Sequence, residues 1–251
     1  MAQEQVWGLV TLPVFIDLDA DASAEYLTLD GPEGRHAATV MRARPGELIE
    51  VVNGRGLRIR AEVEEVTPTG LSLRAVTTVQ DPQSVPHVTI IQALAKAGRD
   101  EMAVEICTEL GADAFIPWQA DRSIVRWNSQ KALKGEKKWR DQAIAAAKQS
   151  RRSYVPEVKS VMKSTELARA IDGYSQVLIC HETATQAIED VDFGMDIAVV
   201  VGPEGGISDA ELAAFEEAGA TAVSLGPHVL RASTAGAVAL AAISIVSGRH
   251  R

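Results

Sequence analysis

The sequence predicts a small β-rich domain followed by a larger α/β domain with a mostly parallel sheet. Residues 1–80 hold alternating, β-branched segments between turn signals, whereas short apolar runs alternate with helical patterns farther along the chain. Between them, the stretch DPQSVP at 81–86 sets two prolines among small polar residues, which is typical of a linker. A chain of 251 residues is long enough for two such domains. We therefore expect domains at 1–80 and 81–251.

The strands of the two domains are predicted from different patterns. In the first domain, segments bounded by the turn sequences NGRG and PTG indicate strands at Glu47–Asn53, Leu57–Thr67 and Leu71–Val79. In the second domain, continuous apolar runs indicate strands at Val88–Ala93, Ala114–Trp118, Val177–Cys180, Ile197–Val201 and Ala222–Leu225. Continuous apolar runs are typical of parallel strands that are buried on both faces, so we expect helices on both sides of this sheet.

One helix of the second domain begins near Asp100 and Glu101, because acidic residues favour a helix N-terminus. Apolar residues then recur every four positions, at Met102, Ile106 and Leu110. Gly111 follows and can adopt the left-handed conformation that ends a helix. We therefore expect a helix over this stretch, ending at Gly111.

A second helix begins after Ser208, which has Glu211 at the spacing of a capping box. Leu212 and Phe215 share one face of this helix, and Gly219 is expected to end it.

Several classes of protein are excluded by what the sequence lacks. Its longest apolar stretches, such as 237–246, are shorter than the ~20 residues that a membrane helix needs. The first ten residues, MAQEQVWGLV, lack the basic and apolar regions of a signal peptide, so we expect a cytoplasmic protein with no membrane partner. Cys107 and Cys180 stand far apart, which indicates no disulfide framework, and both are predicted to be small core residues.

Familiar cofactor and catalytic motifs are also missing. The chain has no GxGxxG, GxxxxGK[ST] or GxSxG sequence. His181 and Glu182 begin like a zinc-protease motif, but Thr185 stands where the second histidine would be, and no cysteine cluster replaces it. We expect no metal cofactor.

The charge of the chain is distributed unevenly. The formal net charge is −9, yet residues 81–160 carry +3, against −5 before them and −7 after them. Positive charge is concentrated in a basic segment, residues 122–152, which contains ten lysines and arginines and only two acids. Such a run is typical of a solvated helix face, and it is equally compatible with phosphate binding.

A glycine-rich loop follows one predicted strand and precedes the capped helix. It reads Gly202-Pro203-Glu204-Gly205-Gly206. Glycines let backbone approach a ligand closely, and the start of a helix favours an anion. A plain turn between strand and helix is the alternative. Glu204 favours a ligand site, because it is poorly placed for packing and well placed to accept hydrogen bonds or meet a cation.

A second loop, LGPHVLRASTAG at 225–236, follows the next strand and leads into a helix of small residues. Small residues at helical spacing allow close helix packing, which suits an interface, including one with a second subunit. Arg231 stands where a crevice is expected at the carboxyl ends of the strands. Alternatively, Arg231 pairs with one of the many acids of the C-terminal third.

Together these segments resemble a known family. GPEGGISDAEL, LGPHVLRASTA, ALAKAGRDEMAVEICTELGADAFIPWQADRSIVRW, AAKQSRRSYVP and the amino-terminal RHAATVMRARPGELIEVVNGRG are similar to the bacterial 16S rRNA uridine N3 methyltransferases of the SPOUT superfamily. The matches span nearly the whole chain in the order of the family. Many members carry Glu before the threonine of the second loop, where this chain has Ser233. This chain therefore has no carboxylate at that position.

The resemblance implies a PUA-like β-barrel that grips RNA, followed by a trefoil-knotted α/β domain that binds S-adenosyl-L-methionine. It implies a homodimer with the site near the subunit interface. It places the cofactor in three loops, at Ile179, Cys180 and His181, at Gly202, Pro203, Glu204, Gly205 and Gly206, and at Leu225, Gly226, Val229, Leu230, Arg231, Thr234 and Ala235.

The substrate that the resemblance implies is 16S rRNA, free or in the small ribosomal subunit. The residues expected to bind it are Arg35, His36 and Arg42 in the first domain, and Arg122, Ser123, Arg126, Lys148, Gln149, Arg151 and Arg152 in the basic segment. Trp118, Trp127 and Tyr154 are candidates for stacking on bases, although core or interface positions are more typical of such residues.

The chemistry implied is methyl transfer from a sulfonium, which requires alignment and a dry site rather than a metal. Uridine N3 must lose its proton before or during attack, so a base or a stabilising cation is expected. Arg231 is the candidate for the cation, and Arg151 or Arg152 for holding the phosphate or base. Glu204 is assigned to positioning the cofactor or to proton removal.

Three alternatives remain open. A related methyltransferase could act on a ribose hydroxyl or on another RNA. A non-catalytic RNA-binding or assembly factor could use the second domain only to dimerise, although the intact glycine loops argue against this. An unrelated α/β enzyme could act on an acidic metabolite through Arg231, which leaves the basic segment unexplained.

Overall fold

The computed structural model describes residues 12–249, and their contacts divide the chain into two compact units. The N-terminal decapeptide considered above lies outside the described residues. The first unit extends to Pro82 and includes Arg151–Tyr154, a segment that the domain prediction assigned to 81–251. A backbone hydrogen bond explains why the segment 151–154 belongs to the first unit: Gly56 N–H donates to the Ser153 carbonyl at 2.9 Å. The second unit holds residues 83–150 and 155 onward.

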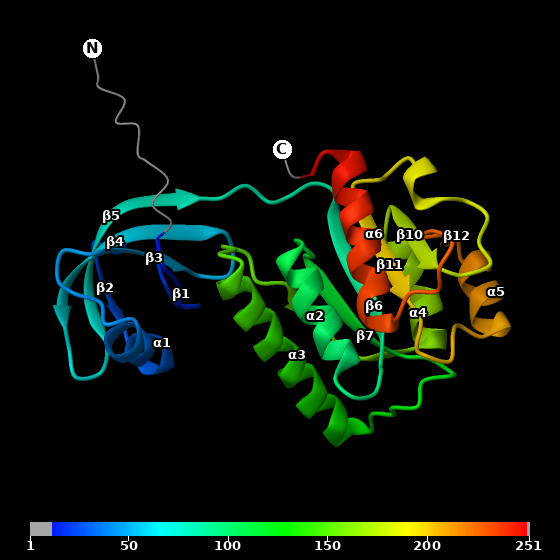
Figure 1. Ribbon diagram of the computed structural model, residues 1–251, viewed down its shortest axis with the longest axis horizontal. Helices are drawn as coiled ribbons and strands as arrows, with labels where there is room; N and C mark the ends of the chain where they lie inside the picture. The colour runs from blue at the N-terminus through cyan, green and yellow to red at the C-terminus, as the bar shows by residue number, and fades with distance from the viewer. Residues whose placement is uncertain (1–11, 250–251) are drawn as a thin grey trace, which may run out of the picture. The chain divides into compact units, whose positions relative to one another are not determined.

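The first unit is built on one five-stranded sheet (Figure 1). Its strands are β1 (Val14–Ile16), β2 (Tyr26–Leu29), β3 (Leu48–Val52), β4 (Leu57–Val66) and β5 (Leu71–Gln80), in the order β1-β3-β4-β5-β2. β1 pairs with β3 in parallel, and the other pairs are antiparallel. β1 and β2 lie at the two edges and do not pair, so the predicted barrel is a curled, half-closed sheet.

Alternation along β4 explains its place in this sheet. Leu57, Ile59, Ala61 and Val63 are buried, and the residues between them are partly exposed. Register shifts in the β4–β5 pairing lie between Arg60 and Ala61 and between Val63 and Glu65, and such bulges bend a sheet.

A short helical segment follows β2. It consists of helix α1 (Gly31–Arg35) and a π-helical turn, η1 (His36–Val40). A Cβ on Gly34 would collide with the Leu29 carbonyl oxygen, so close packing of this helix on β2 requires glycine there.

The second unit contains a seven-stranded sheet in which every pairing is parallel. Its strands are β6 (His87–Ala93), β7 (Ala114–Gln119), β8 (Glu157–Val158), β9 (Met162–Lys163), β10 (Gln176–Cys180), β11 (Asp196–Val201) and β12 (Thr221–Val223). The order is β12-β10-β11-β6-β7-β8, and β9 also pairs with β7. The α/β prediction is therefore confirmed.

Two apolar clusters cover the two faces of this sheet, as the alternation of buried residues along each strand requires. On β6, Val88 and Ile90 join one cluster, and Ile91 and Ala93 join the other. Helices α2 (Arg99–Glu109), α3 (Ser129–Gln149) and α6 (Ala232–Ser247) contribute to the first cluster. Helices α4 (Ser164–Ala170) and α5 (Asp209–Glu217) contribute to the second, and the short helices η2 (Ile171–Gly173) and η3 (Ile188–Asp190) complete the unit.

Helix α2 packs on the core through two sets of side chains. Its buried residues are Asp100, Ala103, Val104, Cys107 and Thr108, whereas Ile106 and Leu110 pack partly buried against the same cluster. Met102, the first residue of the four-residue period, is 49% exposed. Small buried side chains allow α2 to approach α6 closely, since a Cβ on Gly236 would lie 3.3 Å from Cys107 Sγ.

The capping box of α5 is confirmed. Glu211 N–H donates to Ser208 Oγ at 3.2 Å, and Ser208 N–H donates to Glu211 Oε2 at 2.9 Å. Gly219 takes the expected left-handed conformation, with φ of +99°. Helix α6 begins at Ala232, earlier than the small-residue run predicted, so Ser233 and Thr234 belong to its first turn.

Among the described residues, no helix has the length and apolar character of a bilayer span.

Candidate functional site

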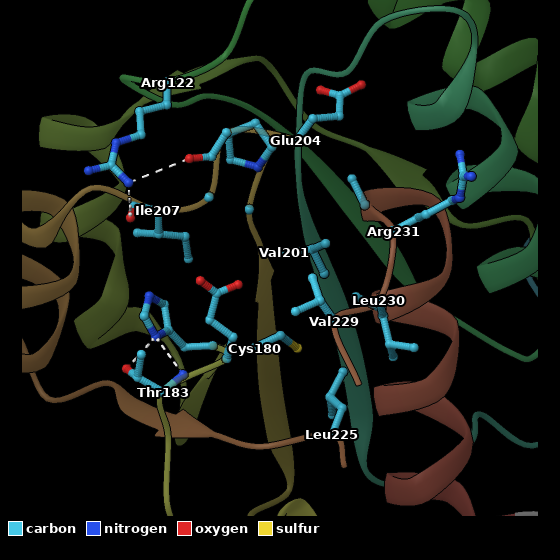
Figure 2. A pocket seen from close by; sticks show the side chains of 18 of the residues that line it. Arg122, Cys180, Thr183, Val201, Glu204, Ile207, Leu225, Val229, Leu230 and Arg231 are labelled. Carbon is cyan, nitrogen blue, oxygen red and sulfur yellow. Dashed lines mark hydrogen bonds between the residues drawn. The ribbon is translucent and has the colours of Figure 1, made fainter. Parts of the chain in front are cut away.

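A cavity of about 590 Å³ opens at the carboxyl ends of β10, β11 and β12 in the second unit (Figure 2). Cys180 and Val201 are the last residues of two of these strands, and Ser224 directly follows the third. The other lining residues come from the segments that follow the strands: His181, Glu182, Thr183, Gly202–Ile207, Asp209, Leu225, Gly226, His228–Ala232 and Ala235, with Arg99 and Arg122. Such an edge is where open parallel sheets bind ligands.

The glycine-rich loop forms one wall of the cavity. Gly206 N–H donates to the Pro203 carbonyl at 2.9 Å, which closes a tight turn, and Gly206 has φ of +74°. A Cβ on Gly202 would lie 2.8 Å from Ile207 Cγ1. The backbone at position 202 can therefore pass this close to Ile207 only with glycine there.

Glu204 reaches from this loop to the segment between β6 and α2. Its Oε1 accepts the Lys96 backbone N–H at 3.2 Å and lies 3.5 Å from Arg99 Nη1. The contacted segment includes two successive left-handed residues, Ala97 and Gly98. Glu204 Oε2 has no partner among the described residues, and the side chain is 17% exposed. The carboxylate thus both holds this segment and keeps one oxygen available.

Arg231 is exposed at the start of α6 and lines the cavity. Its carbonyl accepts the N–H groups of Thr234 and Ala235, at 2.9 and 3.0 Å. Within residues 12–249 its guanidinium forms no ion pair, so the alternative in which Arg231 pairs with a nearby acid is wrong for the described chain. The first turn of α6 also lines the cavity at Ala232 and Ala235, and the N-terminal end of a helix favours negative charge.

Cys180, the last residue of β10, and His181, which follows it, also contribute polar atoms to the cavity. His181 Nδ1 lies 2.9 Å from Thr183 Oγ1 and accepts the Thr183 N–H at 3.4 Å, which leaves Nε2 to carry the proton of a neutral ring (Figure 2). Burial raises the pKa of the Cys180 thiol to about 12. This thiol therefore stays neutral near pH 7 and is a poor nucleophile.

The structure gathers most of the predicted cofactor residues around this cavity. All line it except Ile179, which is fully buried within β10, and Thr234, whose Oγ1 donates to the Arg231 carbonyl at 3.2 Å. Cys180, predicted as a core residue, lines the cavity as well. Sequence reasoning did not assign ten lining residues to the cofactor site: Arg99, Arg122, Glu182, Thr183, Val201, Ile207, Asp209, Ser224, His228 and Ala232. Of these, Arg122 was predicted only as an RNA contact.

The predicted RNA-binding residues fall into separate groups. In the first unit, Arg35 and Arg42 are exposed, and the His36 ring packs edge-on against Phe15. Farther along the chain, Gln149 and Arg151 are exposed, whereas Lys148 and Arg152 are half-buried.

Three residues near the start of the basic segment behave differently from that prediction. Arg126 Nη2 donates to the Asp121 carbonyl at 2.6 Å, and Arg122 lines the cavity. Ser123 is buried, so its assignment as a surface contact is wrong. Trp118 is fully buried against Phe215 and therefore cannot stack on a base.

Helix α3 carries most of the basic segment, and part of its charge is neutralised. Ion pairs join Lys137 to Asp141, Lys138 to Glu101 and Arg140 to Glu136. Lys131 and Lys134 are exposed and have no ion-pair partner among the described residues. These two lysines are the most available cations of the helix.

The residues present fit a polar organic cofactor that carries a carboxylate. The cavity volume lies in the range of small-molecule sites, its wall is a loop that depends on glycine, and a helix N-terminus borders it. No group of three or more metal-ligating side chains is found in the described part of the chain.

Comparison with known proteins agrees with this geometry. Residues 81–244 match the RNA methyltransferase domain family, and residues 29–76 match the RNA methyltransferase PUA domain family. The chain is 42% identical to ribosomal RNA small subunit methyltransferase E of Mycobacterium bovis over 247 residues, covering 96% of this chain and 94% of that protein. It is 32% identical to the Bacillus subtilis protein of the same name, covering 92% and 94%.

A solved structure extends the likeness to a bound ligand. The ribosomal RNA small subunit methyltransferase E of Neisseria gonorrhoeae, bound to S-adenosyl methionine, superposes with a TM-score of 0.84 at 28% identity. The superposition covers 94% of this chain and 98% of that one.

Proposed function

This chain belongs to the ribosomal RNA small subunit methyltransferase E family, and we propose that it methylates N3 of a uridine in 16S rRNA with S-adenosyl-L-methionine. The observation that carries the proposal is the cavity at the strand ends, which joins a glycine-dependent loop, a helix N-terminus and an arginine without an ion-pair partner among the described residues. S-adenosyl-L-methionine supplies a methyl group on a sulfonium, which a nitrogen nucleophile can attack directly.

The cofactor would be held by the glycine loop, the segment after β10 and the start of α6. The first turn of α6 is the positive end of the helix dipole, which attracts the carboxylate of the cofactor. His181 presents Nε2–H as a donor, because Nδ1 is engaged with Thr183. Val229 and Leu230 add apolar surface on the side opposite Arg122 (Figure 2), which suits an apolar wall around the reacting groups.

Arg231 and Glu204 are the catalytic residues of this proposal. Arg231 stabilises the negative charge that develops on the uracil as N3 loses its proton. Glu204 is engaged through Oε1 only, which leaves Oε2 to accept that proton. Arg151 or Arg152 would hold the phosphate or base of the target nucleotide.

The Cys180 thiol is not activated as a nucleophile toward the uracil ring. Carbon 5 of uracil becomes nucleophilic when a thiolate adds to the ring, and that step requires an ionised cysteine. Burial keeps the Cys180 thiol neutral, with a pKa of about 12. Cys107 is more deeply buried and has an equally raised pKa.

The RNA would be gripped by both units. Lys131 and Lys134 of α3 offer cations to phosphates, and Arg35 and Arg42 offer them on the first unit. These cations give the protein local positive surface for RNA although its net charge is negative.

A homodimer and a cytoplasmic location complete the proposal. Helix α6 exposes apolar side chains, with Ile245 73% and Val238 38% exposed, and a second copy of the chain would cover them. Light scattering on the purified protein measures this state directly. The cytoplasm is where small ribosomal subunits are available as substrate.

The test is methyl transfer from radiolabelled S-adenosyl-L-methionine to small ribosomal subunits that lack the modification. Incorporation into 16S rRNA supports the proposal. Cofactor binding without transfer would point to another RNA, and the absence of both would favour a non-catalytic RNA-binding factor.

A further inference from the structure

Arg122 lies outside the three loops assigned to the cofactor, yet it holds one of them. Its Nη1 donates to the Gly205 carbonyl at 3.4 Å and to the Ile207 carbonyl at 3.2 Å, and Figure 2 draws both bonds. The two carbonyls belong to the glycine loop, which forms a wall of the cavity. One nitrogen of Arg122 therefore ties together two peptide groups of that wall.

The two segments also touch through their backbones. A Cβ on Gly205 would lie 3.1 Å from Arg122 Cβ and 3.2 Å from the Arg122 carbonyl oxygen. Both distances are tighter than ordinary van der Waals contact, so a Cβ at position 205 would push the two segments apart by a few tenths of an ångström. Arg122 thus fixes the position of the loop by contact as well as by hydrogen bonds.

Arg122 is itself held in place by its neighbours. The adjacent Asp121 N–H donates to Glu211 Oε1 at 2.7 Å, and the Asp121 carbonyl accepts Arg126 Nη2 at 2.6 Å. Glu211 also forms the capping box of α5, the helix that begins just after the glycine loop. The connection between β7 and α3 is therefore fastened at Asp121, next to the residue that holds the loop.

We infer that Arg122 is a positioning residue for the cofactor, which acts through the glycine loop. This inference rests on the proposed function, because the ligand of the cavity is the proposed cofactor. Arg122 Nη1 is engaged by the Gly205 and Ile207 carbonyls of that loop. Removing the side chain releases the Gly205–Ile207 wall, which lowers the affinity of the cavity for every form of the cofactor alike.

The test measures cofactor affinity in the absence of RNA. Calorimetry compares Arg122→Ala and Arg122→Lys with the unaltered protein, using S-adenosyl-L-methionine and its decarboxylated form, which lacks only the carboxylate. We expect Arg122→Ala to weaken both ligands by about tenfold, the equivalent of one ordinary hydrogen-bond contribution. Arg122→Lys should recover part of the affinity, since an ammonium can reach one carbonyl. Gly205→Ala, which displaces the loop from the other side, should weaken both ligands in the same direction.

The matched control is Lys131→Ala, an exposed cation of α3. It should weaken binding of small ribosomal subunits and leave cofactor affinity unchanged, whereas Arg122→Ala should weaken cofactor binding. Thermal melts establish that each variant is folded, and the KM for the cofactor should rise more than kcat falls.

Four results would overturn or separate the claims. Unchanged cofactor affinity in Arg122→Ala overturns the inference while the proposed function stands. A loss confined to the carboxylate-bearing ligand shows direct contact with the cofactor and overturns positioning. A loss of RNA affinity without any loss of cofactor affinity shows that Arg122 contacts RNA and overturns the positioning role. Failure of the unaltered protein to bind either ligand refutes the proposed function itself.

Discussion

Replacing Glu211 with alanine should destabilise the second unit more than any surface change on α5. Glu211 is buried and accepts hydrogen bonds from four donors: Asp121 N–H at 2.7 Å, Ser164 Oγ at 2.6 Å, Ser208 N–H at 2.9 Å and Ser208 Oγ at 2.9 Å. The two hydroxyl groups can rotate toward other acceptors, but the two backbone N–H groups cannot.

The magnitude follows from those two N–H groups. A buried donor that loses its acceptor costs about 2 kcal/mol, so Glu211→Ala should lower the free energy of unfolding by about 4 kcal/mol. Glu211→Gln keeps one acceptor oxygen and should cost roughly half as much. Glu217→Ala, on an exposed position of the same helix, should change stability by less than about 0.5 kcal/mol and is the matched control.

Urea unfolding followed by tryptophan fluorescence suits this measurement, because Trp118, Trp127 and Trp139 all lie in the second unit. Burial alone would raise the pKa of Glu211, but hydrogen bonds from Ser164, Ser208 and Asp121 together lower it. Its stabilisation is therefore present above the unfolded pKa, about 4.3, and is lost as pH falls through the folded value. A cost below about 1 kcal/mol at pH 7, or a cost that grows on acidification, would refute the reasoning.

Three further predictions concern pH, RNA and catalysis. Burial raises the pKa of Asp100 from 3.8 to about 6, so the free energy of unfolding should fall by about 2 kcal/mol from pH 4 to 6, and Asp100→Asn should abolish that slope in urea titrations. The double variant Lys131→Ala, Lys134→Ala should weaken RNA binding. The slope of log K against log salt concentration should become shallower by about 0.7–0.9 for each phosphate that is no longer neutralised. An unchanged slope would show that α3 is not part of the RNA-binding surface. Glu204→Gln should lower kcat about 100-fold, because the amide cannot accept the proton of N3. Cofactor affinity should not change, because the amide oxygen still accepts the Lys96 N–H. An unchanged kcat would exclude Glu204 as the base.

Local patterns predicted the parts of the fold that depend on neighbouring residues. The main strands of the second unit were recognisable because continuous apolar runs are needed wherever both faces of a sheet are covered. The capping box at Ser208 was also predictable from the sequence, because its partner Glu211 is only three residues away. Strands β1, β2, β8 and β9 were missed because two to four residues are too few to show a period.

The residues missed at the site depend on the order of strands instead. Arg99 and Arg122 reach the cavity because β6 lies beside β11 and β7 lies beside β6, and a single sequence does not reveal that order. A usable signal existed, since both arginines come shortly after the carboxyl end of a parallel strand. Applying that rule to every predicted strand would have added both residues to the candidate site.

The basic segment shows a second limit of composition. Counting charge was equally compatible with a solvated helix face and with a phosphate-binding surface. In the structure, three basic residues of α3 form ion pairs with acids, and two arginines near its start bind backbone carbonyls. Charge counts describe how many cations a segment has, whereas the fold determines which remain available.

The measurement that tests the central claim most directly is nucleoside mass spectrometry of 16S rRNA. Small ribosomal subunits lacking the modification are incubated with the protein and S-adenosyl-L-methionine, and the digested RNA is compared with a sample that lacks the protein. The account predicts one new nucleoside, 3-methyluridine, and its loss with Arg231→Ala. A methyl group on a ribose hydroxyl or on carbon 5 would contradict the assignment of N3.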